Sequence, residues 1–181
     1  SMPPTPPSPA PPELLAPAGG LEQACAALHY GADAVYCGLP RFSARADAEN
    51  FTWESLRELV AFAHAQTPRR RVYVAFNTLL MDREMADAAE ALQRLSEIGA
   101  DAVIVQDLGV ARLARRHFPG LRLHASTQSA VHSVEGARAL TQLGFVRVVL
   151  ARELSLEEVG AIARGSGLEV ETFVHGALCY S

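Results

Sequence analysis

The sequence predicts an α/β protein, specifically an incomplete TIM-like (β/α) barrel with about seven parallel strands and six helices. One observation is a repeated helix-to-strand junction: residues 29–36 (HYGADAVY) are echoed by 97–104 (EIGADAVI) and more loosely by 142–149 (QLGFVRVV). Each copy has a helix end, a glycine suited to the left-handed conformation, a short loop and an apolar strand. A second observation is the strict alternation of short apolar runs with helical stretches, which is typical of parallel sheets built from βα units.

A doubly wound open sheet would show the same alternation. That fold usually carries a glycine-rich phosphate loop after its first strand, and residues 16–20 (APAGG) do not match this fingerprint. Complete barrels need roughly 250 residues, whereas this chain has 181. We therefore expect the front part of a longer barrel, lacking its final helix and eighth strand, with exposed first and last strands.

The predicted elements follow one another from residue 13 to residue 181. Before them, residues 1–12 are predicted to be a disordered leader, because Ser1-Met2 resembles a tag scar and residues 3–12 are rich in proline. One strand is predicted to end at Gly38, and the others are predicted at residues 13–15, 72–76, 103–105, 121–124, 146–150 and 170–174.

The helices between these strands are predicted from apolar periodicity and from capping residues. Three of them cover residues 21–28, 53–66 and 134–143. A fourth ends at His117. Thr52 and Asp82 are expected to cap helices, and Ser155 with Glu158 has capping-box spacing before the last one.

The composition limits the possible functions. The chain is 49% hydrophobic and 20% charged with a net charge of -4, and it has no apolar run of membrane-spanning length. No membrane partner is therefore expected. All basic residues are arginine, so this stretch excludes Schiff-base, Walker-lysine and Ser-Lys chemistry. Three cysteines without a disulfide pattern favour a reducing, cytoplasmic setting.

Polar residues follow the ends of the predicted strands, where barrels build their sites. The residues at these strand ends include Gly38 and Cys179. The others are candidate catalytic groups and candidate substrate-binding groups. The catalytic candidates are Asn77, Asp107, Glu153 and His175. The substrate-binding candidates are Gln106, His124, Ser126, Gln128 and Arg152. Asp107 could equally be a helix cap, and Arg152 with Glu153 a structural ion pair.

General catalytic motifs are mostly lacking. Ser126, His124 and Asp107 supply the residue types of a serine triad without its diagnostic spacing. A cysteine nucleophile, Cys179, paired with His175 remains conceivable. Cys25 on an apolar helix face and Cys37 at a strand end are most simply core residues.

Several stretches together resemble the U32 peptidase family, the collagenase-like peptidases. They are residues 13–19 (ELLAPAG), 31–36 (GADAVY), 123–128 (LHASTQ), 149–154 (VLAREL) and 173–179 (FVHGALC). Within the family, residues 103–107 and 124–128 look most like the branch that hydroxylates a cytidine of 23S ribosomal RNA. Sister branches hydroxylate tRNA uridine or act in oxygen-independent ubiquinone synthesis.

The resemblance implies a barrel with a [4Fe–4S] cluster held by four cysteines, of which Cys179 matches the first. The other three ligands would lie beyond Ser181, so this chain is not expected to assemble the cluster. The resemblance also implies RNA as a partner, either rRNA or tRNA, and a small anionic metabolite such as prephenate. Arg152 is the expected carboxylate partner, because its guanidinium fork matches a carboxylate.

Three functions remain in view. The first is a fragment of an iron–sulfur-dependent RNA hydroxylase that is inactive by itself. The second is the peptidase that the family name records, for which no nucleophile-base-orienter set can be identified. The third is a non-catalytic barrel portion that acts as a binding module.

Overall fold

In the computed structural model, which describes residues 12–40, 51–76, 85–126, 131–150 and 154–172, seven strands form one sheet in chain order. All neighbouring strands are parallel. The strands are β1 (Leu15–Pro17), β2 (Ala34–Gly38), β3 (Arg71–Phe76), β4 (Ala102–Val105), β5 (Leu123–Ala125), β6 (Phe145–Val149) and β7 (Glu169–Glu171).

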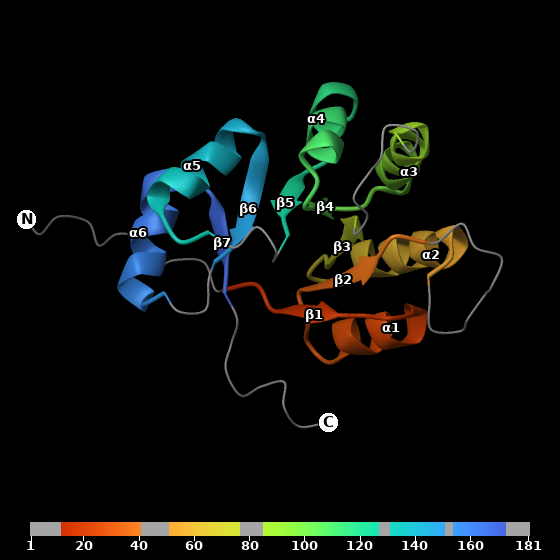
Figure 1. Cartoon of the computed structure of the whole chain (residues 1–181). Helices are drawn as coiled ribbons and strands as arrows, with labels where there is room; N and C mark the ends of the chain where they lie inside the picture. The colour runs from red at the N-terminus through yellow and green to blue at the C-terminus, as the bar shows by residue number, and fades with distance from the viewer. Residues whose placement is uncertain (1–11, 41–50, 77–84, 127–130, 151–153, 173–181) are drawn as a thin grey trace, which may run out of the picture.

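One helix separates each strand from the next among the described residues, and the helices lie outside the curled sheet (Figure 1). They are α1 (Leu21–His29), α2 (Trp53–His64), α3 (Met85–Ile98), α4 (Leu108–His117), α5 (Val134–Gln142) and α6 (Leu156–Ser166). This arrangement confirms the incomplete TIM-like barrel of about seven parallel strands and six helices.

The largest boundary differences concern the starts of two strands and the end of α2, which stops at His64, two residues before the expected end at residue 66. β1 begins at Leu15 and β5 at Leu123, each two residues later than expected. Before β1, the side chain of Asp33 accepts the Leu14 N–H at 2.8 Å, so a carboxylate replaces a ladder bond there. The expected cap Asp82 and the end of the last predicted strand lie outside the described residues.

Local sequence signals account for the helix ends. The repeated glycines Gly31, Gly99 and Gly144 have φ of 113°, 86° and 96°, as the junction pattern predicted. The expected cap Thr52 accepts the Ser55 N–H, and the Ser155/Glu158 capping box is formed. Each junction therefore ends its helix and starts the next strand by short-range chemistry.

Two apolar layers form on opposite faces of the sheet. The larger one packs the strands against the helices. The smaller one lies inside the curl, where Ala34, Tyr73 and Ala102 are buried against Leu15 and Tyr36. Alternation along each strand assigns residues to one layer or the other.

An irregularity between β5 and β6 changes this alternation. Leu123 pairs with Phe145, but the next residue, His124, pairs with Arg147. Phe145 belongs to the outer core, whereas Arg147 lies over the Tyr73 ring inside the curl, 5.2 Å from its centroid. A regular strand would turn residues two apart to the same face, so the irregularity is what brings Arg147 inside.

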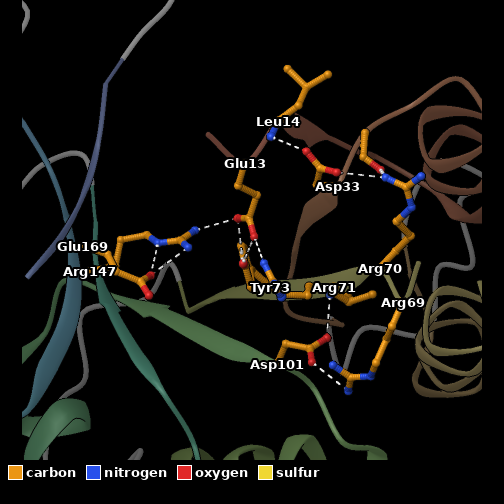
Figure 2. A network of polar contacts seen from close by, with 12 residues as sticks. Glu13, Leu14, Asp33, Arg69, Arg70, Arg71, Tyr73, Asp101, Arg147 and Glu169 are labelled. Atoms are coloured by element: carbon orange, nitrogen blue, oxygen red, sulfur yellow. Dashed lines mark hydrogen bonds and ion pairs between the residues drawn. The ribbon is translucent and has the colours of Figure 1, made fainter. Parts of the chain in front are cut away.

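A charged network occupies the amino-terminal end of the curl (Figure 2). Arg147 donates to Glu13 at 2.8 Å and to Glu169 at 2.8 Å, and the Tyr73 hydroxyl donates to Glu13 at 2.7 Å. Arg71 also pairs with Glu13. One carboxylate before β1 is thereby joined to β3 and β6, and through Arg147 to β7.

The aspartates of the repeated junction have equivalent roles at the same end. Asp33 accepts the Leu14 N–H and pairs with Arg70 at 3.0 Å. Asp101 accepts the Val72 N–H at 2.8 Å and pairs with Arg69. The repeat in sequence is thus also a repeat in structure, in which a carboxylate secures the start of the preceding strand.

Candidate functional site

A cavity of about 530 Å³ lies inside the curl toward the carboxyl ends of the strands, and all seven strands contribute to its lining. Its volume is within the range of small-molecule sites. At Gly38 an added Cβ would meet nothing within 4 Å, so the cavity is open beside β2. The side chains with polar atoms in its lining are Gln23, Tyr36, Cys37, His124, Ser126 and Glu171.

His124 lies in the wall of this cavity. It is 4% exposed, and its ring contacts the Tyr73 ring edge-on with centroids 4.7 Å apart. Burial, together with the nearby Arg147 charge, lowers the pKa of His124 to about 3. The imidazole is therefore neutral near pH 7, with one nitrogen that donates a hydrogen bond and one that accepts.

Glu171 presents a carboxylate to the same cavity. Burial raises its pKa, the Arg147 charge opposes this, and the Glu13 charge adds to it. Among the described residues its carboxylate has no hydrogen-bond partner, although its backbone carbonyl accepts the Leu150 N–H at 2.9 Å. Sequence reasoning missed Glu171, but the alternation Glu-Val-Glu in β7 could have identified it.

Tyr36 and Ser126 complete the polar wall. The pKa of Tyr36 is raised by burial and by the Glu171 charge, so the phenol stays protonated near pH 7. Ser126 directly follows β5, and its backbone N–H donates to the Val105 carbonyl at 3.1 Å. Of the predicted substrate-binding residues, the cavity thus brings together His124 and Ser126.

The other predicted site residues fall into two groups. Asp107 caps α4, where its Oδ1 accepts the N–H groups of Gly109 and Val110 at 2.7 and 3.1 Å. This cap accounts for the position of Asp107, and neither Asp107 nor Gln106 is among the residues lining the cavity. Six predicted residues lie outside the described part of the chain and stay predictions: Asn77, Gln128, Arg152, Glu153, His175 and Cys179.

The two described cysteines do not fit the ligand set of an iron–sulfur cluster. Cys37 is 2% exposed, and burial raises its pKa to about 12, so its thiol resists the ionisation that metal ligation needs. Cys25 belongs to α1 and packs against the outer core. Within the described ranges no three His, Cys, Asp or Glu side chains gather as metal ligands. Both cysteines are core residues, as predicted.

The fold and the site together define a class, a TIM-like α/β barrel protein with a ligand-sized cavity at the edge where barrels build their sites. Within that class the chain belongs to peptidase family U32, whose family model matches residues 19–181.

Two curated relatives are named for RNA modification. The chain is 43% identical over 167 residues to the 23S rRNA 5-hydroxycytidine C2501 synthase of Escherichia coli strain K12, covering 92% of this chain and 25% of that protein. It is 40% identical over 169 residues to tRNA hydroxylation protein P of the same strain, covering 93% of this chain and 37% of that protein. The chain thus spans well under half the length of either relative.

A solved structure supports the fold. The U32 peptidase Mk0906 matches with a TM-score of 0.70 at 18% identity, covering 94% of this chain and 72% of that one. Across the described residues, no helix combines the length and apolar character that crossing a bilayer requires.

Proposed function

We propose that the full-length protein hydroxylates a pyrimidine of ribosomal or transfer RNA and that this chain supplies the front of its barrel. The observation that carries the proposal is the 43% identity to a protein named as an rRNA hydroxycytidine synthase. The similarity extends over 92% of the chain, so it includes the strands that line the cavity.

The chemistry of the described cavity argues against a serine peptidase. A serine peptidase needs a nucleophile hydrogen-bonded to a histidine base. Among the described residues Ser126 and His124 are not bonded to each other, and Asp107 caps α4. The lowered pKa of His124, about 3, also makes it a poor base near neutral pH.

The cofactor and the metabolite belong to the same proposal. A [4Fe–4S] cluster, with Cys179 as one thiolate ligand, would supply the redox chemistry of the full-length protein. Arg152 would bind a small anionic metabolite such as prephenate through its guanidinium fork. With ribosomal or transfer RNA as its substrate, the full-length protein would act in the cytoplasm.

The activity is tested by mass spectrometry of nucleosides from rRNA and tRNA, in cells with and without the gene for the full-length protein. We expect a hydroxylated pyrimidine to disappear from one of these RNAs when the gene is removed and to return with the gene. An unchanged nucleoside profile, together with gelatin cleavage by the purified protein, would refute the hydroxylase and favour the peptidase.

The cluster is tested separately by iron and sulfide analysis of the full-length protein purified without oxygen. We expect Cys179→Ala to lose iron and sulfide. The matched control Cys25→Ser should keep both, because Cys25 belongs to α1 and packs against the outer core. Equal iron content in wild-type protein and Cys179→Ala would remove Cys179 from the ligand set.

A further inference from the structure

We propose that Glu171, with Tyr36 and His124, binds the hydrogen-bond-donating edge of a planar, uncharged ring inside the barrel. This inference rests on the proposed function, in which that ring is the target pyrimidine base. It assigns a specificity role to a residue inside β7 that the strand-end pattern did not include.

The position of Glu171 follows from the pleat of β7. Glu169 pairs with the inward-facing Arg147, and Val170 packs against the outer core. Successive strand residues face opposite sides of a sheet, so Glu171 faces inward with Glu169. Because the strands are parallel, it lies nearer their carboxyl ends, where the cavity is.

The charge of the described lining selects the type of ligand. Glu171 is the one charged group in that lining. Among the described residues, Arg147 is the cation whose charge lowers the pKa of Glu171, but its guanidinium already pairs with Glu13 and Glu169. A half-buried carboxylate with no hydrogen-bond partner among the described residues is stabilised by a ligand that brings N–H donors, and it repels a ligand that brings a second carboxylate.

Tyr36 and His124 supply ring surfaces and further hydrogen-bonding groups for a flat ligand. Both line the cavity, and the neutral His124 imidazole offers one donor and one acceptor. Enzymes that modify a base extrude it into a pocket, where it is held by stacking and by hydrogen bonds to its edge. A carboxylate is a suitable acceptor for the amino group of cytosine, and the cavity of about 530 Å³ has room for such a ring.

The test measures cytidine binding to the full-length protein by equilibrium dialysis. We expect Glu171→Leu, which removes both acceptor oxygens, to weaken binding at least about tenfold. Glu171→Gln, which keeps one acceptor, should fall between this variant and wild type. Glu169→Gln changes the same face of β7 outside the cavity and should remain within about twofold of wild type, because its carboxylate does not line the cavity.

Two results would overturn the inference. One is wild-type cytidine affinity in both Glu171 variants. The other is tighter binding of prephenate to Glu171→Gln than to wild type, with cytidine binding unchanged, because this would place an anion beside Glu171.

Nucleoside mass spectrometry separates this inference from the proposed function. Full RNA hydroxylation by Glu171→Leu would overturn the inference and leave the proposed function standing. The opposite outcome is also possible. If Glu171→Leu loses cytidine binding but the wild-type protein leaves all RNA nucleosides unchanged, the ring site is supported and the proposed function is refuted.

Discussion

Arg147 on β6 donates a hydrogen bond of 2.8 Å to Glu13, which precedes it by 134 residues. Their side chains are 14% and 15% exposed, so the pair is largely removed from water. The bond joins the segment before the first strand to the sixth strand across the inside of the curl (Figure 2). The network around it therefore helps to set the curvature that creates the cavity above it.

Replacing Arg147 with Met should destabilise the barrel by about 3 kcal/mol, because a buried Glu13 carboxylate would lose its main partner. Hydrogen exchange of the β1 and β6 amides in the full-length protein measures this effect. The control Arg122→Met removes an ion pair that is about half exposed, and it should change stability by less than about 1 kcal/mol. Equal protection in wild type and Arg147→Met would contradict a stabilising role.

Asp101→Ala should destabilise the start of β3 by about 1–3 kcal/mol. The Asp101 carboxylate is 11% exposed, and it accepts the Val72 N–H while contacting His64 at 2.8 Å. Its removal leaves a part-buried N–H without its partner. Urea unfolding followed by circular dichroism measures the change, with Asp87→Ala on the exposed side of α3 as the control. A loss no larger than that of the control would refute this role.

His124 should make stability depend on pH. Burial lowers its folded-state pKa from 6.5 to about 3, so between these values the unfolded chain binds more protons. The stabilisation is complete above pH 6.5 and is lost as the pH falls toward 3. His124→Phe keeps a ring against Tyr73 but removes the titration, so its stability should fall less between pH 6.5 and 4.5.

The unfolding free energy from urea titrations at several pH values tests the His124 prediction. Parallel pH profiles for wild type and His124→Phe would show that the imidazole is not held neutral by the fold.

Gly99→Ala should destabilise the protein by about 1–2 kcal/mol, because Gly99 has φ of 86° and a Cβ strains that conformation even in open space. Gly120→Ala is a matched control: an added Cβ there also meets nothing within 4 Å, and its φ is not positive. The difference between the two variants in thermal unfolding isolates the backbone effect. Equal melting temperatures for Gly99→Ala and Gly120→Ala would contradict backbone strain at residue 99.

The repeated junction shows which structural features can be predicted from local sequence patterns. Gly31 and Gly99 were predicted to be left-handed, and Thr52 was predicted to cap a helix; all three predictions are confirmed because each depends on neighbours within a few residues. The strand-end rule placed His124 and Ser126 at the cavity. The same rule selected Asp107, which the structure uses to cap α4. A residue at a strand end can serve either the site or the following helix, and spacing does not separate these roles.

Arg147 and Glu171 mark the limit of that reasoning. Both lie within runs that were predicted only as apolar strands, yet both face the inside of the curl. The inward position of Arg147 depends on an irregularity in pairing between β5 and β6, which is a property of two strands rather than of either sequence. The importance of Glu171 depends on its having no hydrogen-bond partner among the described residues that surround it in space.

The order of helices and strands, their caps and the glycines at their junctions follow from the amino-acid sequence, because they arise from interactions over a few residues. Three features arise only when the sheet curls. They are the ion pair between Glu13 and Arg147, the neutral state of His124 and the inward position of the Glu171 carboxylate. Curling brings strands that are far apart in the chain around one space, and burial there changes the charge and the partners of each side chain.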